Sequence, residues 1–67
     1  MRVLSFRDLR EIKGLPYSRV HVERLVREGK FPPPVRLSPA RLAFVEAEVD
    51  QWLAERIAAR DADQTAA

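Results

Sequence analysis

The sequence contains no cysteine and a single histidine, so the usual cross-links of a very small protein are absent. Without cysteine there is no disulfide and no thiolate metal site, and one histidine cannot form a zinc site alone. Only two residues are glycine, and they do not form a loop that could cradle a phosphate. We therefore expect no metal and no cofactor, and stability must come from a small apolar core.

The chain also lacks a long apolar run. No hydrophobic stretch approaches the roughly 20 residues that span a bilayer, and no signal peptide is apparent at the N-terminus. We therefore expect a soluble, cytoplasmic protein with no membrane partner. Its 67 residues allow a single domain, which we place at residues 1–60. Residues 61–67 are small and polar, and we predict a disordered C-terminal tail there.

Basic side chains are concentrated in the first two thirds of the chain. From Met1 to Phe44 there are ten lysines and arginines against four acids, whereas Val45 to Ala67 holds two arginines against six acids. A basic front and an acidic rear are typical of a protein that binds a polyanion. The same charges would also keep a small domain in solution, so the charge pattern by itself leaves nucleic-acid binding open.

A first helix is predicted from Phe6 to Lys13. Ser5 and Asp8 have the spacing of a capping box, in which each side chain accepts a hydrogen bond from the other residue's backbone N–H. Apolar residues recur on one face of this segment: Phe6, Leu9 and Ile12. Two turns are too few to be stable alone in water, so this helix must pack on another element.

A second helix is predicted over residues 18–28. Ser18 is a suitable N-cap, Gly29 supplies the left-handed residue that ends a helix, and Pro32 prevents its continuation. The apolar stripe consists of Val22, Leu25 and Val26. The opposite face carries Val20, Arg24 and Arg27, with His21 and Glu23 beside them. One face is therefore suited to a core, and the other is basic and exposed.

The connection between these helices, residues 14–17, is short and begins with glycine. A short helix, a tight turn and a second short helix form the outline of a helix-turn-helix. Any helical hairpin can match this outline, so it favours DNA binding without establishing it.

A small β-hairpin is predicted after the second helix. Prolines 32–34 enforce an extended path, and segments 35–37 and 41–44 then alternate apolar and basic residues around Ser38-Pro39-Ala40. The candidates for its inner side are Val35, Leu37, Leu42 and Phe44. Two strands are marginal on their own, so this hairpin must lie against the helices, as a wing does in DNA-binding domains.

A third helix is predicted from Glu46 to about Arg60, with acids in its first turn, where the helix dipole favours them. Its apolar stripe consists of Val45, Val49, Trp52, Leu53 and Ile57. Trp52 is a conceivable stacking platform for a base, but its spacing from Val49 and Leu53 favours a core position. Together these elements predict a mainly α-helical domain with a small β-hairpin, a winged helix-turn-helix of three helices and a two-stranded wing.

Three motifs within residues 3–57 resemble the AlpA family of prophage regulators. They are Gly14-Leu-Pro-Tyr-Ser-Arg, Arg24-Leu-Val-Arg-Glu-Gly-Lys-Phe-Pro and, after Phe44, Glu48-Val-Asp-Gln-Trp-Leu. The chain is similar, more broadly, to excisionase-like and MerR-like winged helix-turn-helix domains. This resemblance implies a sequence-specific DNA-binding protein, acting as a transcriptional regulator or as an excision factor that shapes DNA for an integrase. The chain departs from the family where Ser38-Pro39-Ala40 replaces a common glycine in the wing turn, and where Phe44 replaces a common tryptophan.

The B-DNA major groove admits one α-helix and presents distinct donor and acceptor patterns. We expect the second helix to enter it with its N-terminal turn toward the bases. The candidate DNA-binding residues are Tyr17, Ser18, Arg19, Val20, His21, Arg24, Arg27, Lys30, Arg36 and Arg41. Arg19 and Arg24 are candidates for base contacts, because a guanidinium can bridge two acceptors of guanine, and Val20 is a candidate for a thymine methyl group.

The other candidates are assigned to less specific contacts. Tyr17 and His21 are within reach of a phosphate or a base edge, and Ser18 is primarily the helix cap. The residues assigned to the DNA backbone are Arg27, Lys30, Arg36 and Arg41, of which the last two also suit the adjacent minor groove. Arg19 and His21 have an alternative interpretation as solvent-exposed side chains that contact no DNA. Val20 would equally suit contact with a protein partner.

A single small module buries only about 600–1,000 Å² on DNA. We therefore expect several copies on repeated sites in double-stranded DNA, with the acidic third helix of one copy against the basic front of the next, or action beside an integrase or recombinase. The alternative is a small adaptor that docks on a recombinase or packaging enzyme through Val20 and Tyr17. Salt distinguishes them, because phosphate contacts weaken steeply as salt rises. We expect no enzyme and assign no catalytic residue, because no paired carboxylates are spaced for a cleft and no phosphate-binding loop is present.

Overall fold

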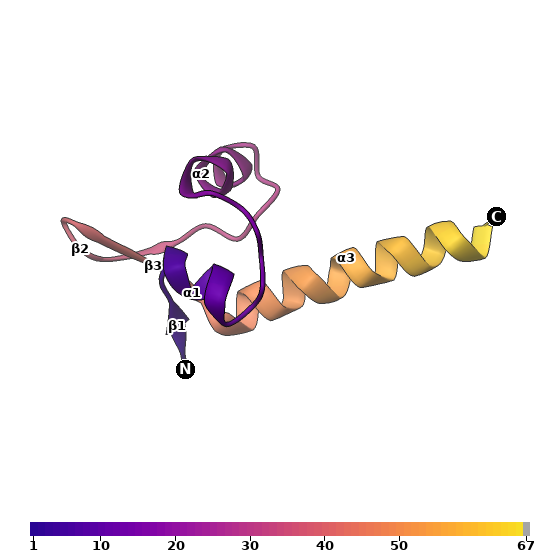
Figure 1. Ribbon diagram of the computed structural model, residues 1–67, viewed down its shortest axis with the longest axis horizontal. Helices are drawn as coiled ribbons and strands as arrows, with labels where there is room; N and C mark the ends of the chain where they lie inside the picture. Colours follow the sequence, from indigo (N-terminus) through magenta and orange to yellow (C-terminus); the bar gives the residue numbers. More distant parts are fainter. Residues whose placement is uncertain (67) are drawn as a thin grey trace.

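A computed structural model of the chain describes residues 1–66. The elements in chain order are β1 (Val3–Leu4), α1 (Phe6–Glu11), α2 (Arg19–Arg27), β2 (Val35–Ser38), β3 (Arg41–Val45) and α3 (Glu46–Ala66). Figure 1 shows α2 on one side of the body, the β2–β3 hairpin extending outward, and α3 projecting in the opposite direction. The predicted three helices and small hairpin are confirmed. No helix within residues 1–66 combines the length and the apolar character needed to cross a bilayer.

The capping box predicted for α1 is present. Ser5 Oγ accepts from the Asp8 N–H, and Asp8 Oδ2 accepts from the Ser5 N–H, both at 3.1 Å. The helix ends at Glu11, before the predicted Lys13, and the chain turns at Gly14 with φ of +69°. The prediction that Ile12 faces inward is wrong: it lies past the last helical residue and is 43% exposed. Leu15, just after the turn, is buried instead.

α2 begins and ends where the sequence predicted, at the Ser18 cap and just before Gly29. Ser18 Oγ accepts from the His21 N–H at 3.2 Å, as an N-cap does. At the other end Gly29 has a φ of +72° and donates to the Val26 carbonyl, while Lys30 donates to the Leu25 carbonyl at 2.8 Å. This pair of bonds is a Schellman motif, in which a left-handed glycine satisfies the last carbonyls of the helix.

The hairpin is part of a three-stranded antiparallel sheet in the order β1-β3-β2. Leu4 of β1 pairs with Phe44 of β3, so the N-terminal segment forms a strand at the edge of the sheet. The prediction that Val35 and Leu37 face inward is wrong, since they are 45% and 57% exposed. The hairpin runs away from the helices (Figure 1), so the side chains of Val35 and Leu37 have little to pack against. The register of the hairpin also shifts between Arg36 and Ser38.

The core lies where the helices meet the base of the sheet. Its buried members are Leu4, Leu9, Leu15, Val22, Phe31, Phe44 and Val49. Phe44 is fully buried, with edge-to-face contacts to Phe6 at 5.2 Å and to Phe31 at 5.5 Å between ring centroids. Trp52 is half-buried and packs against this cluster, as the core interpretation of its spacing predicted.

α3 begins at Glu46, so Val45 belongs to β3 and not to the helix stripe. The helix continues past the predicted end near Arg60 as far as Ala66. Alanine is the best helix former, and no glycine or proline interrupts residues 61–66, which accounts for this extension. Ala67, the last residue of the predicted tail, lies outside the described residues. The prediction that Ile57 is a core residue is wrong, because it is 49% exposed.

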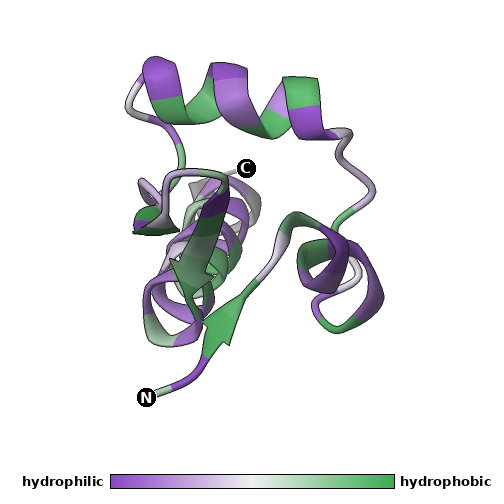
Figure 2. Cartoon of the chain, turned by 90° about the vertical axis from the view of Figure 1, so that its left-hand side faces the viewer, coloured by the Kyte–Doolittle hydropathy of each residue, from purple (hydrophilic) through white to green (hydrophobic). Residues whose placement is uncertain are grey.

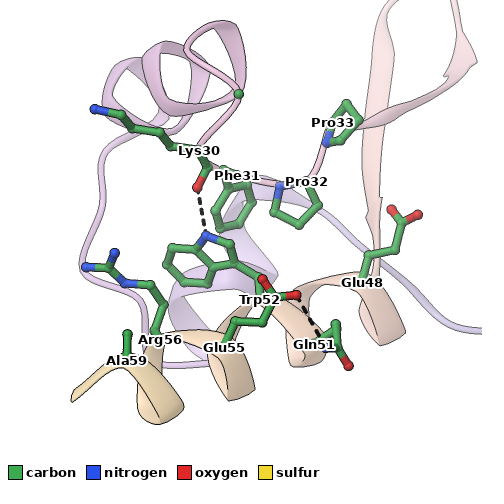
Figure 3. Close-up of a pocket in the computed structure, with 11 residues that line it drawn as sticks. Lys30, Phe31, Pro32, Pro33, Glu48, Gln51, Trp52, Glu55, Arg56 and Ala59 are labelled. Atoms are coloured by element: carbon green, nitrogen blue, oxygen red, sulfur yellow. Dashed lines mark hydrogen bonds between the residues drawn. The ribbon is translucent and has the colours of Figure 1, made fainter. Parts of the chain in front are cut away.

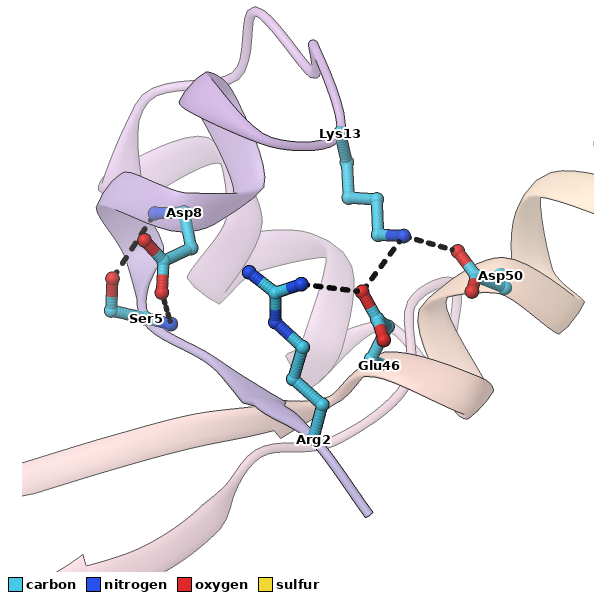
Figure 4. A network of polar contacts seen from close by, with 6 residues as sticks. All are labelled: Arg2, Ser5, Asp8, Lys13, Glu46 and Asp50. Atoms are coloured by element: carbon cyan, nitrogen blue, oxygen red, sulfur yellow. Dashed lines mark hydrogen bonds and ion pairs between the residues drawn. The ribbon is translucent and has the colours of Figure 1, made fainter.

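An ion-pair cluster joins the end of α1 to the start of α3 (Figure 4). Lys13 Nζ lies 2.9 Å from Asp50 Oδ1 and 3.1 Å from Glu46 Oε2, and Arg2 Nη1 lies 3.9 Å from the same Glu46 oxygen. Hydrogen bonds to Asp50, then to Glu46, raise the pKa of Lys13 above its ordinary value. Lys13 is therefore engaged in holding α1 against α3.

Candidate nucleic-acid interface

The outward face of α2 is exposed and carries basic side chains. Val22 is buried at 2% exposure, whereas Val20, on the opposite side of the same helix, is 73% exposed. Arg24 and Arg27 are exposed beside Val20. α2 has nine residues and is therefore about 14 Å long. It lies above the other elements in the view of Figure 2.

Most of the predicted contact residues are accessible in the structure. The exposed candidates are Ser18, Arg19, Val20, Arg24, Arg27, Lys30, Arg36 and Arg41. Tyr17 and His21 are half-buried. In both ribbon views α2 lies above the hairpin, which extends outward from beneath it (Figures 1 and 2). The structure thus brings the α2 residues onto one helix and sets Arg36 and Arg41 apart from them on the wing.

Arg19 is held by two neighbours and is not free at the front of α2. Its guanidinium carbon lies 4.7 Å from the centroid of the Phe6 ring, and its Nε donates to Glu23 Oε1 at 3.1 Å. The i, i+4 spacing of Arg19 and Glu23 was visible in the sequence. The contact with Phe6 was not, because it depends on how α1 packs against α2.

Arg24 has a different environment on the same helix. Its Nη2 lies 3.1 Å from His21 Nδ1, and the His21 ring in turn lies 4.6 Å from the Tyr17 ring between centroids. Among the described residues, no carboxylate forms an ion pair with Arg24 or Arg27, unlike Arg19. Among the arginines of α2, the positive charge available to an anionic ligand therefore lies on the second half of the helix.

The wing arginines and Lys30 lie at the margins of this surface. Arg36 Nη1 donates to the Pro39 carbonyl at 3.4 Å, across the wing turn. Arg41 is exposed at the start of β3. Lys30 Nζ is 3.6 Å from Glu28 Oε1, so part of its charge is offset at the end of the helix.

Trp52 of α3 connects this helix to the segment just after α2. Its Nε1 donates to the Lys30 carbonyl at 2.7 Å, and its ring lies 4.8 Å from Phe31 between centroids. Figure 3 shows a shallow hollow here, between the proline segment and α3, with Pro32 and Trp52 on its walls. The hydrogen bond fixes the backbone at the point where α2 ends, a role that spacing alone did not reveal.

Two helices joined by a tight turn, followed by a β-hairpin and a third helix, define the chain as a winged helix-turn-helix protein. The family described as prophage CP4-57 regulatory protein (AlpA) matches residues 2–57. The chain belongs to this family of phage-type regulatory proteins, as its motifs indicated.

A relative from a bacteriophage supports this assignment. The chain is 39% identical over 59 residues to an uncharacterized protein, ORF88, of Enterobacteria phage P4. The match covers 88% of this chain and 65% of the relative, so the chain spans slightly less than two thirds of that protein's length. None of the solved structures matches the chain.

Proposed function

We propose that this protein binds specific sites in double-stranded DNA and acts as a phage-type transcriptional regulator or excision factor. α2 enters the major groove, and the wing of residues 35–44 lies on the backbone or in the adjacent minor groove. The observation that carries this proposal is the two-sided character of α2, with Val22 buried and Val20, Arg24 and Arg27 exposed. A short helix whose exposed Arg24 and Arg27 form no ion pair within the described part of the chain fits a groove lined by acceptors and flanked by phosphates.

The residues divide by the kind of contact they would make. Arg24 is the foremost candidate for guanine, and Val20 for a thymine methyl group. The contact with Phe6 and the pair with Glu23 place Arg19 at the edge of α2, where a phosphate contact suits it better than a base contact. The backbone set otherwise consists of Ser18, Arg27, Lys30, Arg36 and Arg41, whereas the half-buried Tyr17 and His21 would make no phosphate contact of their own.

Affinity would be increased by repeated sites or by a partner. One module of this size buries too little surface for high specificity, so several copies on tandem sites, or one copy beside an integrase or recombinase, complete the assembly. Shift assays on duplexes with one and with two copies of a site measure this directly. Binding that stays non-cooperative on the double site, with no integrase present, would contradict self-association.

The test begins with selection of bound duplexes from a random pool, followed by binding measurements over a series of salt concentrations. Arg24→Ala should cost about 1–3 kcal/mol on the selected site and blur its sequence preference, whereas Arg36→Ala should weaken all duplexes alike and lower the salt slope by about 1. Arg60→Ala is the matched control, because it removes the same charge from α3, outside the proposed interface. Equal effects of Arg24→Ala and Arg36→Ala on every duplex would refute the division of roles.

A second candidate function follows from one observation: Val20 is 73% exposed in the middle of the basic face. An adaptor would use Val20 and Tyr17 to dock on a recombinase or packaging enzyme. Such docking would be insensitive to salt and abolished by Val20→Asp, whereas DNA binding falls steeply as salt rises. Absence of any duplex binding at low salt would favour the adaptor.

A further inference from the structure

Three side chains, one just before α2 and two within it, form a connected series. Tyr17 packs against the core cluster and its ring lies beside that of His21, tilted by 40°. His21 is half-buried, and its Nδ1 lies 3.1 Å from Nη2 of the exposed Arg24. A side chain fixed to the core is thus linked, through one imidazole, to the arginine that faces outward.

The direction of the hydrogen bond is set by the chemistry of the two groups. A guanidinium has five N–H donors and no acceptor, so His21 Nδ1 must accept. The neutral imidazole therefore carries its proton on Nε2. Because Nη2 has two hydrogens and gives one to His21, its second hydrogen and those of Nη1 remain available for an end-on pair of bonds to a planar acceptor such as guanine.

Holding an arginine matters because its side chain is long and has many rotamers. A free side chain must lose that freedom when it contacts a base edge, whereas one already oriented loses less. Within residues 1–66 no carboxylate forms an ion pair with Arg24, whereas Arg19 is turned toward Glu23 and Phe6. The His21 imidazole, with Nδ1 3.1 Å from Arg24 Nη2, is an acceptor that can orient this guanidinium.

We infer that His21 is a positioning residue, which orients Arg24 toward a guanine and so sets sequence discrimination rather than overall affinity. This inference rests on the proposed function and names its specificity-determining pair. The ligand it requires is a duplex with guanine at the position read by Arg24. Phosphate contacts by Arg27 and the wing would be unaffected by His21, because they lie outside this series.

Two substitutions separate the hydrogen bond from the bulk of the side chain. His21→Leu keeps an apolar group of similar size beside Tyr17 and removes the acceptor. His21→Asn places an amide oxygen close to the position of Nδ1 and retains it. Each is compared on the selected duplex and on the same duplex with the contacted guanine replaced, and thermal melts verify that both variants fold.

His21→Leu should reduce the preference for guanine by about tenfold, within the range that one bidentate base contact supplies, and leave binding to random duplex nearly unchanged. His21→Asn should retain most of the preference. In an Arg24→Ala background, His21→Leu should have no further effect, since the group it positions is gone. An unchanged preference in His21→Leu, an equal loss on all duplexes, or an effect that persists without Arg24 would overturn the inference.

A measurement on the unmodified protein tests the same point independently. Nitrogen-15 NMR of the imidazole should show the neutral ring protonated on Nε2, and a proton on Nδ1 would overturn the inference. Failure of the proposed function has a different signature, because the unsubstituted protein would then bind no duplex or show no sequence preference. That result would overturn both proposals, whereas a guanine preference that ignores His21 overturns this one alone.

Discussion

Replacing Trp52 separates the packing of its ring from the hydrogen bond of its indole N–H. Trp52→Phe keeps an aromatic ring against Phe31 but removes the donor that binds the Lys30 carbonyl at 2.7 Å. Trp52→Ala removes both the ring and the donor. Gln51→Ala is the matched control on the same helix, because Gln51 is exposed and its amide donates to Glu55 Oε1 at 3.3 Å.

The expected losses follow from these contacts. The missing hydrogen bond should cost about 1 kcal/mol, and the smaller ring about another 1 kcal/mol of buried area. Trp52→Phe should therefore lower the melting temperature by about 8–16 °C for a domain of this size. Trp52→Ala should cost about 3–5 kcal/mol, as much as the roughly 3–5 kcal/mol that the core of a domain of only 67 residues supplies. The alanine variant should be largely unfolded, whereas Gln51→Ala should change stability by less than about 0.5 kcal/mol.

Far-UV circular dichroism is the suitable probe for thermal unfolding, because both variants lack the only tryptophan. A Trp52→Phe variant that melts like the unsubstituted protein would show that the indole N–H contributes nothing. A Trp52→Ala variant that folds normally but no longer binds DNA would make Trp52 a stacking platform, and would refute its place in the core.

Three further substitutions test single features. Gly29→Ala should destabilise the domain by about 1–2 kcal/mol in denaturant titration, from its φ of +72° alone, since no atom lies within 4 Å of an added Cβ; a more stable variant would contradict this. Ser18→Ala should cost about 0.5–2 kcal/mol through loss of the α2 cap, unlike Ser38→Ala on the wing. Because its partners raise the pKa of Lys13, its ion pairs should stabilise the fold fully below the ordinary value of 10.5 and weaken as pH rises through the higher folded value. Lys13→Met should remove the part of the stability loss at alkaline pH that comes from these ion pairs. Identical stability–pH profiles for Lys13→Met and the unsubstituted protein would contradict this.

The helix boundaries near the proposed interface were predictable because their signals are local. Ser18 and Gly29 act within a few residues of their own positions, so a sequence pattern alone places α2 between them. The same holds for the Ser5 and Asp8 capping box. The buried and exposed faces of α2 followed from helical spacing, since only one side of a short helix can meet a core.

Features that depend on distant parts of the chain were not predictable. Val35, Leu37 and Ile57 are apolar at suitable spacing, but the hairpin and α3 extend beyond the body, and these residues remain 45–57% exposed. The contact of Arg19 with Phe6 and the bond from Trp52 to Lys30 join separate elements, so spacing within one helix could not reveal them.

The projecting part of α3 has a consequence for local stability. From about residue 58 onward the backbone amides are held by the hydrogen bonds of the helix itself, and isolated helical segments this short are marginal in water. Hydrogen exchange should therefore be fast along this segment and slow across β3 and the buried side of α2, which open only when the whole domain unfolds. Limited proteolysis should accordingly shorten α3 from its C-terminal end while the winged domain stays intact.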